Sequence, residues 1–446
     1  MLRVRREQDR EILRLAFPAF LTLLAEPLFL LADSAIIGHL GTGPLAGLSI
    51  AGTVMSLTVG LCIFLAYGTT GSVARQVGAG DRRAALAQGV SGLWLAVALG
   101  IVLTLAGVLL AHPLTALFGA SPEVQSYAVD YLRVAVLGLT PLLLMLAATG
   151  VLRGLQDTRT PLVVAVSANV INVVLNYVLV YGLDWGIAGS AWGTVIAQSL
   201  AALALVRVVL RGARLEHAPF APMIGGIRDA ARAAVPLVIR SLSLQAALAG
   251  TTYAASVLAG AGDQAVHLAT HQLTLTIWFF LAYALDAIAI AAQAITGRYL
   301  GAGDVAATQA VTGRMVQWGV WSGAAAALPV VAISPWAGLA FTNDPEVQRL
   351  LTRTLLVVAL GLPLAGVVFV LDGILIGAGD TRFLAGAQVL ALLAYAPLAT
   401  AVVWTSDSLP LLWAAFAIGW VAVRCALLVI RQRGGAWLVT GAQTPR

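Results

Sequence analysis

Charged residues are scarce in this sequence, lysine is absent, and cysteine occurs only twice. Only 10% of the 446 residues are charged and 60% are hydrophobic, whereas about 25% of the residues of a soluble protein carry a charge. This composition excludes a soluble globular protein and indicates an integral membrane protein with several spans. Cys62 and Cys425 lie in apolar runs near opposite ends of the chain, so we expect no disulfide framework.

The sequence also lacks the motifs of enzymes and of ATP-driven pumps. It contains no HExxH, CxxC or Walker sequence, the patterns that place a metal, a thiol pair or a nucleotide phosphate. We therefore expect neither an enzyme nor a bound cofactor, and any uphill transport must use an ion gradient. Asp263, His267 and His271 are spaced by four, but no cysteine or second carboxylate supports a metal site there. The 26 basic residues are scattered over loops, which argues against nucleic acid as a partner.

Long apolar runs predict the membrane topology. A helix needs roughly 20 residues to cross a bilayer, and about twelve runs of that kind centre near residues 27, 56, 100, 136, 170, 198, 245, 280, 323, 362, 392 and 420. Arginines gather before the first run, in every second connection and in the tail, and basic loops remain in the cytoplasm. We expect both termini in the cytoplasm. The use of arginine without lysine indicates a GC-rich genome, and we expect the protein in the cytoplasmic membrane of a bacterium.

The chain repeats itself at a constant distance. Three motifs occur twice, each pair 223 residues apart: RQVGAGD at Arg75–Asp81 and RYLGAGD at Arg298–Asp304, PEVQ at Pro122–Gln125 and at Pro345–Gln348, GVLRGLQDTR at Gly150–Arg159 and GILIGAGDTR at Gly373–Arg382. An even number of helices in each half gives both halves the same orientation. We therefore expect an all-α protein with twelve transmembrane helices in two parallel six-helix lobes, residues 1–206 and 233–446, joined by a basic cytoplasmic linker, residues 207–232.

The repeated motifs have a structural interpretation as turns. Their glycines let the chain turn at the end of a helix, and the aspartates that follow can cap the next helix. We expect caps from Asp81 and Asp304 and, in the second motif pair, from Asp157 and Asp380.

The apolar run from Phe17 to Gly41 carries the strongest functional signal. It contains two acids, Glu26 and Asp33. An ionised Asp at the centre of a membrane helix costs about 2.5–3.5 kcal/mol, so intramembrane acids are functional by default. Pro27 removes a backbone hydrogen bond and is expected to bend the helix one to two turns before Asp33. We interpret Asp33 as a functional acid on the wall of a cavity. The alternative is an acid merely paired with a buried donor.

Three amides follow one another at helical spacing in the run that starts at Pro161. Asn169, Asn172 and Asn176 share one face of a helix. They must point into the protein, because lipid offers no hydrogen-bond partners. They either hold helices together or face Asp33 across a cavity and hold its proton, an ion or a ligand.

The second half carries polar residues of its own at membrane depth. Arg240 and Gln245 lie in the seventh run, Asp286 interrupts the eighth, and Asp372 lies late in the tenth. Arg240 either neutralises one of these acids or takes part in transport. Asp33 itself has no counterpart in this half, because the residue 223 positions further on is Ser256.

LADSAIIGHLG at Leu31–Gly41, followed by PLAG at Pro44–Gly47, resembles the first-helix signature of the multidrug and toxic compound extrusion (MATE) family, in its DNA-damage-inducible protein F-like branch. GIAGSAWGTVIAQ at Gly186–Gln198 is similar to the family as well, and the resemblance covers nearly the whole chain. It implies two six-helix lobes that form a V around a central cavity. The implied function is antiport, in which cationic or amphipathic compounds leave against inward H+ or Na+.

The resemblance assigns roles in the first half residue by residue. Asp33 matches the essential first-helix acid, whose protonation accompanies bending at Pro27. Asn172 and Asn176 match the polar pair of the fifth helix. Many members have Asp where this chain has Asn176, so the resemblance implies a poorer cation site around Asp33.

In the second half, Asp286 matches a common eighth-helix acid of the family. Asp372 resembles the tenth-helix acid of sodium-coupled members, but their seventh-helix Glu is missing here; Arg240 and Gln245 are the other candidates. Sodium requires several oxygens and a charge in one place, whereas a proton requires one buried carboxylate. We therefore expect H+ as the coupling ion, with Na+ as the alternative.

Two other functions remain alternatives. A lipid-linked precursor flippase of the same superfamily would carry several cavity arginines for a pyrophosphate, and Arg240 is the one clear candidate. A membrane-embedded enzyme would need a catalytic cluster at a membrane face, and the sequence contains none. We expect a monomer in contact with lipid that handles small amphipathic or cationic molecules.

Overall fold

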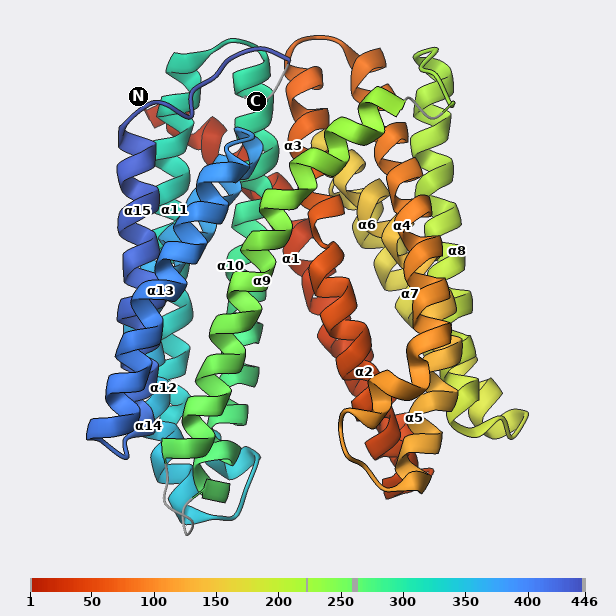
Figure 1. Ribbon diagram of the computed structural model, residues 1–446. Coiled ribbons are helices and arrows are strands. Elements are labelled where there is room, and N and C mark those ends of the chain that lie inside the picture. Colours follow the sequence, from red (N-terminus) through yellow and green to blue (C-terminus); the bar gives the residue numbers. More distant parts are fainter. Residues whose placement is uncertain (1, 222–223, 259–263, 443–446) are drawn as a thin grey trace. The chain divides into compact units, whose positions relative to one another are not determined.

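The computed structural model describes residues 2–221, 224–258 and 264–442, without the side chains of residues 2–5, 26, 29–31, 224 and 229. Asp263 and the side chain of Glu26 therefore lie outside the described residues. The described chain is helical throughout (Figure 1). Its first eight helices are α1 (Leu2–Gly38), α2 (Thr42–Cys62), α3 (Phe64–Gly78), α4 (Arg82–Ala116), α5 (Pro122–Ala135), α6 (Leu139–Gly154), α7 (Arg159–Tyr177) and α8 (Gly186–Leu215).

The second series begins after the chain segment 216–223. It comprises α9 (Ile224–Leu258), α10 (Gln264–Gly301), α11 (Val305–Ala337), α12 (Pro345–Gly377), α13 (Thr381–Thr405), α14 (Leu409–Ala415) and α15 (Val423–Arg433). Short 3-10 segments join α5 to α6 and follow α11, and π-helical segments at Val178–Gly182 and Phe416–Ala422 extend α7 and link α14 to α15. All twelve expected span centres fall within helical segments.

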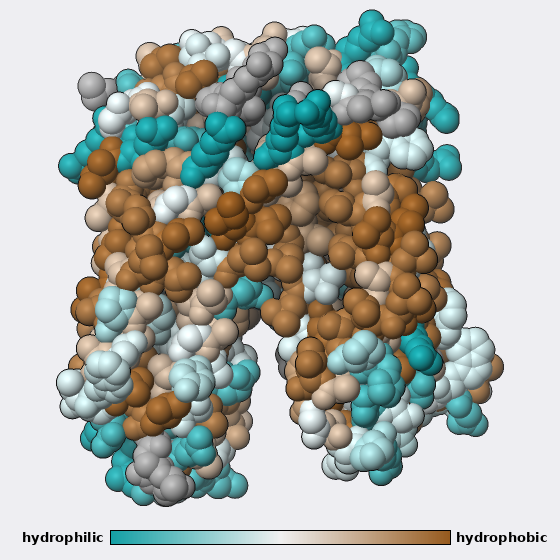
Figure 2. All heavy atoms as spheres, viewed as in Figure 1, coloured by the Kyte–Doolittle hydropathy of each residue, from teal (hydrophilic) through white to brown (hydrophobic). Residues whose placement is uncertain are grey.

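The helices are long and apolar enough to cross a membrane. Among the described residues, eleven helical segments meet criteria of length and composition for a span, and α1 is a further helix of 37 residues. Figure 2 shows hydrophobic side chains over the middle of the helices and hydrophilic ones toward their ends. A band of apolar surface along helices is expected where lipid replaces water.

The described helices pack into two compact units. The first unit is Leu21–Val235, and the second unit is Met1–Phe20 together with Pro236–Arg446. Helix α1 therefore belongs to both. Its first turns are tied to the second unit by Arg314, whose Nε lies 2.6 Å from Oδ1 of Asp9, and by an ion pair between Arg298 and Glu11. The expected linker, residues 207–232, is largely helical, because α8 runs to Leu215 and α9 begins at Ile224.

Helix caps confirm most of the turn interpretation and correct one part of it. The Asp81 side chain accepts a hydrogen bond from the Ala84 amide at 2.7 Å, and Asp304 accepts one from the Ala307 amide at 2.8 Å. Asp157 accepts from the first amides of α7, at 3.0 Å.

The expectation for Asp380 was wrong. Its side chain caps no amide at the start of α13 and instead binds Nε of Arg431 at 2.6 Å. A nearby guanidinium is a stronger partner for a carboxylate than a neutral amide. The arginine comes from α15, and nothing in the repeated motif itself indicates it.

The repeat is also visible in how the helices cross. Gly150 of α6 packs so closely on α3 that a Cβ there would lie 2.5 Å from the carbonyl oxygen of Ala66. Gly373 of α12 packs on α10 in the same way, with 2.2 Å to the carbonyl oxygen of Ala289. Both partners are again 223 residues apart. Glycine is required at these places because any side chain would collide with backbone of the neighbouring helix.

Candidate coupling site

Asp33 lies deep in the first unit, near the end of α1. Its side chain is 4% exposed. Its Oδ1 atom accepts a hydrogen bond from Nδ2 of Asn176 at 2.8 Å and a second one from the Ser190 hydroxyl. Asn176 comes from α7 and Ser190 from α8, so the carboxylate joins three helices.

Two of the three amides of α7 meet at this acid. Nδ2 of Asn176 also donates to Oδ1 of Asn172 at 3.1 Å, and Asn172 donates in turn to the Thr194 hydroxyl at 3.0 Å. Asn172 and Asn176 are 3% and 0% exposed. Asn169 does not join them: its Nδ2 donates to the backbone oxygen of Ala25, 2.8 Å away on α1.

Three residues of this network were not identified from the sequence. They are Ser190 and Thr194 of α8, which bind Asp33 and Asn172, and Tyr131 of α5, a buried residue whose hydroxyl lies close to Asp33. One signal was available, because Ser190 and Thr194 lie one helical turn apart and so share a face. Tyr131 is bordered by charged residues in a partly exposed helix, and no local pattern distinguishes it.

Gly193 makes room for the Asn176 amide. A Cβ at Gly193 would lie 2.0 Å from Oδ1 of Asn176, so the amide oxygen occupies the space that a side chain would fill. This oxygen has no hydrogen-bond partner among the described residues, and the amide NH2 group faces the carboxylate. Asn176 therefore presents donors to Asp33.

The surroundings of Asp33 are polar but neutral. Its hydrogen-bond partners are the Asn176 amide and the Ser190 hydroxyl, and no charged side chain among the described residues contacts it. A charged group at membrane depth is usually paired with an opposite charge. Asp33 has no such pairing within the described chain. Its neutral partners can instead donate to the ionised carboxylate or, through a hydroxyl oxygen, accept from the protonated carboxyl.

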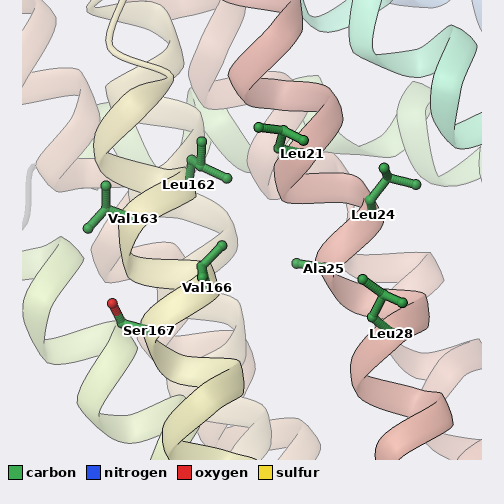
Figure 3. Close-up of a pocket in the computed structure, with 8 residues that line it drawn as sticks. All are labelled: Leu21, Leu24, Ala25, Leu28, Leu162, Val163, Val166 and Ser167. Atoms are coloured by element: carbon green, nitrogen blue, oxygen red, sulfur yellow. The ribbon is translucent and has the colours of Figure 1, made fainter.

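An apolar groove lies between α1 and α7, beside the turns of α1 that precede Asp33. Its volume is about 470 Å³. Figure 3 shows its lining: Leu21, Leu24, Ala25 and Leu28 from α1 and Leu162, Val163, Val166 and Ser167 from α7. Pro27 lies within the same stretch of α1, which continues as one helix through it. The Asn169 contact with Ala25 holds α1 against α7 beside this proline.

The second unit contains a different acid site. Asp372 of α12 is 3% exposed, and its Oδ2 accepts a hydrogen bond from Nη2 of Arg240 on α9 at 2.9 Å and another from Nη2 of Arg424 on α15. The pairing of Arg240 with one of the acids was expected, whereas Arg424 was not identified. It lies in a run bounded by aromatic residues, and its partner is distant in sequence.

Two further candidates of the second unit, Asp286 on α10 and Gln245 on α9, are half-buried. Nε2 of His271 lies 3.0 Å from the Thr252 hydroxyl. Within residues 2–221, 224–258 and 264–442 no three ligand side chains gather as a metal site would require. Cys62 and Cys425 are free thiols.

Comparisons with known proteins agree on one family. The family model described as MatE matches residues 18–178 and 236–401. Protein DETOXIFICATION 44, chloroplastic, of Arabidopsis thaliana is 31% identical over 85% of this chain and 74% of its own length. DNA damage-inducible protein F of Escherichia coli K12 is 29% identical over 96% of this chain and 94% of its own. A probable multidrug resistance protein NorM of Bradyrhizobium diazoefficiens is 29% identical over 95% and 92%.

Solved structures show the same fold. A MATE protein crystallised in a bent conformation superposes with a TM-score of 0.88 at 22% identity, and the match covers 97% of both chains. A transporter of the MOP superfamily from Pyrococcus furiosus gives a TM-score of 0.87 at 21% identity over 96% of both chains.

Proposed function

We propose that this chain, which belongs to the MatE family, is a secondary antiporter that exports amphipathic or cationic organic compounds and is driven by inward H+. Relatives carry names of multidrug resistance proteins, which supports multidrug efflux. The observation that carries the proton assignment is the burial of Asp33 among neutral partners, with no second charge of the described residues in contact. We propose that it works in the membrane as a single chain.

Protonation of Asp33 would change the direction of its hydrogen bonds. The ionised carboxylate accepts from Asn176 and Ser190. A protonated carboxyl has an O–H to donate, and an oxygen that carries a proton is a poorer acceptor. One of the bonds that tie α1 to α7 and α8 would then weaken. Proton uptake thus weakens the attachment of the Asp33 end of α1 to α7 and α8.

A loosened α1 has a place to deform. Pro27 lacks the amide hydrogen that would close a helical hydrogen bond, and bends in helices are commonly found at proline. The apolar groove beside it, lined by α1 and α7, changes shape when α1 moves. We infer that proton binding at Asp33 is converted into a change of the surface offered to an apolar substrate.

Sodium fits this site less well. A hard cation binds oxygen ligands and prefers several of them. Here Asn176 offers Asp33 its NH2 group, and its oxygen is held against Gly193. In the second unit Asp372 already binds two arginines, which repel a cation. Asp33 therefore favours a proton over sodium as the coupling ion, and the two arginines on Asp372 disfavour either cation there.

The test is transport in proteoliposomes that contain the full chain. An imposed proton gradient in sodium-free buffer is expected to drive exchange of a fluorescent amphipathic cation, and collapse of that gradient with a protonophore should stop it. Exchange that ignores the proton gradient and requires a sodium gradient would refute the assignment. Asp372 and its surroundings would then be the first alternative site.

The proposed location is the cytoplasmic membrane, with both termini in the cytoplasm. Ala79 and Ala302 are exposed residues at equivalent turns of the two halves. In a background of Cys62→Ser and Cys425→Ser, Ala79→Cys and Ala302→Cys should both react with an impermeant thiol reagent only from the cytoplasmic side. Labelling of the two from opposite sides would exclude the parallel arrangement.

One observation favours the flippase alternative. Such a protein was expected to carry several arginines for a pyrophosphate, and Arg424 joins Arg240 at membrane depth. Both arginines bind the same oxyanion, the carboxylate of Asp372.

A further inference from the structure

Two arginines lie at an end of the second unit where basic residues are not expected. Arg349 and Arg353 belong to the first three turns of α12. In the proposed topology this end of α12 faces away from the cytoplasm, whereas the arginines of membrane proteins gather in cytoplasmic loops. Arg349 is engaged by its own helix, since its Nε donates to the backbone oxygen of Pro345 at 3.1 Å. Arg353 makes no such bond within the described chain, so its position needs another explanation.

Arg353 lines a groove that also contains an acid. The groove has a volume of about 510 Å³ and is lined by α12 and by the residues that lead from α13 into α14. Asp407 comes from this connection, and both charged side chains are exposed. Among the described residues neither of them has an ion-pair or hydrogen-bond partner, and they do not pair with each other. The groove therefore presents an open cation and an open anion together.

The remainder of the groove is apolar and continues along α12. Leu356 and Val357 line it one turn beyond Arg353. The same face of α12 carries Leu356, Leu360 and Leu364, which are 40%, 82% and 43% exposed and follow one another at the spacing of a helical turn. Because α12 is long and apolar enough to cross a membrane, we expect this row of leucines to lie against acyl chains.

A tryptophan marks the depth of the charged end of the groove. Trp404 lies in the last turn of α13, three residues before Asp407, and is 82% exposed. Exposed tryptophans are enriched where the bilayer meets water. Arg353 and Asp407 therefore lie near the level of the lipid head groups, and the leucines of α12 extend from there toward the bilayer centre. Charges followed by an apolar row is also the order of groups in a phospholipid.

We propose that this groove binds a phospholipid with a primary ammonium head group, of the phosphatidylethanolamine type. Arg353 donates to the phosphate, Asp407 accepts from the ammonium group, and one acyl chain follows Leu356 and Leu360. A planar guanidinium matches two phosphate oxygens, and a carboxylate accepts hydrogen bonds from N–H groups. The lipid is held at the surface and is not transported, so this inference goes beyond the proposed export function.

The two charges of the groove select among the lipids of a bilayer. A phosphatidylglycerol satisfies Arg353, but it has no positive group for Asp407 and brings a second negative charge near that acid. A phosphatidylcholine has a positive charge but no N–H group to donate to the carboxylate. An ethanolamine head group supplies both the phosphate oxygens and the N–H donors. We therefore expect it to bind more tightly than the other two.

The test measures lipid binding to the full chain, purified in detergent, by native mass spectrometry. The probes are phospholipids with the same palmitoyl and oleoyl chains and an ethanolamine, choline or glycerol head group. Wild type should bind the ethanolamine lipid most tightly at its first site. Arg353→Gln and Asp407→Asn should each weaken that binding about 3- to 10-fold, because each removes one charge-assisted contact at a partly exposed site. In Asp407→Asn the preference over the choline lipid should also be lost.

Matched variants separate the groove from general effects of charge. Arg349→Gln removes the same charge one turn from Arg353, at a residue that does not line the groove, and should bind the ethanolamine lipid like wild type. Glu346→Gln, at another exposed acid of α12, is the corresponding control for Asp407→Asn. A ligand of the folded state raises the melting temperature. The ethanolamine lipid should therefore stabilise wild type and Arg349→Gln more than Arg353→Gln.

Three outcomes would overturn the proposal. One is equal affinity of the ethanolamine lipid for wild type, Arg353→Gln and Asp407→Asn. Another is equal weakening by Arg349→Gln and Arg353→Gln, which would show attraction to the charge of this surface without a site in the groove. The third is tighter binding of the glycerol lipid to wild type, weakened by Arg353→Gln and strengthened by Asp407→Asn. The groove would then be a site for anionic lipid, and Asp407 would not recognise an ammonium group.

Discussion

The acid of the first unit and the acid of the second unit are buried to the same degree but held in opposite ways. Asp33 and Asp372 are 4% and 3% exposed. Asp33 has only neutral donors around it, whereas Asp372 is shared by two arginines. Asp33 thus accepts hydrogen bonds from an amide and a hydroxyl, whereas Asp372 forms two ion pairs. Similar burial in the two halves therefore supports two different functions.

The difference extends to the positions that correspond through the repeat. Asn172, Ser190 and Gly193 of the first unit become Tyr395, Trp413 and Phe416 when 223 is added. In the second unit the Phe416 ring packs on the other two, with ring centres 5.4 Å apart for Tyr395 and Phe416 and 5.7 Å apart for Trp413 and Phe416. The place of the polar network is thus filled by an aromatic core, which explains why the second unit has no second Asp33 site.

Asp33→Asn gives the largest expected effect on function. The amide cannot ionise, so the cycle of proton uptake and release is lost, and export should fall to the level of cells without the transporter. The measurement is efflux of a fluorescent substrate at matched abundance of folded protein in the membrane. The matched control is Ser256→Ala at the corresponding position of the second half, where the hydroxyl bonds only its own helix, and export should be unchanged. Wild-type export by Asp33→Asn would remove Asp33 from the mechanism.

Asp372→Asn gives the largest expected effect on stability. It removes the carboxylate that both guanidinium groups bind, and removal of one partner of a buried pair costs about 3–5 kcal/mol. The melting temperature of the purified protein should fall clearly, and by more than in Arg424→Gln, which leaves a balanced pair. Asp33→Asn should melt close to wild type, because the oxygen of the new amide can still accept from its neutral neighbours. Equal melting of Asp372→Asn and wild type would mean that the two arginines do not depend on Asp372.

Substitution of Gly150 and Gly373, the glycines at equivalent helix crossings, should destabilise the two units to a similar degree. Gly150→Ala and Gly373→Ala both force a methyl group against neighbouring backbone, and overpacking of this kind costs about 1–3 kcal/mol. We expect similar losses of melting temperature in both. Gly250→Ala is the control, since a Cβ there meets no atom within 4 Å. A loss confined to one of the two variants would mean that the repeat does not preserve this crossing.

The smallest expected effects on stability are those of Asp157→Ala and Asp380→Ala, and they should differ in their dependence on salt. Asp157→Ala removes the cap of α7 and should cost about 1 kcal/mol, independent of salt. Asp380→Ala removes a partly exposed ion pair with Arg431, and such pairs are worth about 0.2–1 kcal/mol. Added salt screens that pair, so the difference between Asp380→Ala and wild type should shrink in high salt. The same salt response in both variants would contradict the two assignments.

The sequence by itself determined the helical class, the positions of the spans, the repeat and Asp33. Each of these follows from a local rule: bilayer thickness fixes the length of an apolar run, and a charge inside such a run is conspicuous. Asn172 and Asn176 were identifiable because helical spacing places them on one face.

Only the tertiary structure decided what each acid contacts. Ser190, Thr194 and Tyr131 lie on other helices than Asp33, and hydroxyls in a membrane helix are too common to single out. Asp372 and Arg424 are 52 residues apart, and Asp380 has its expected cap replaced by Arg431. Contacts between helices depend on how the helices rotate and cross. The crossing geometry is set by side chains spread over the whole unit, such as Gly150 and Gly373, so no short stretch of sequence contains it.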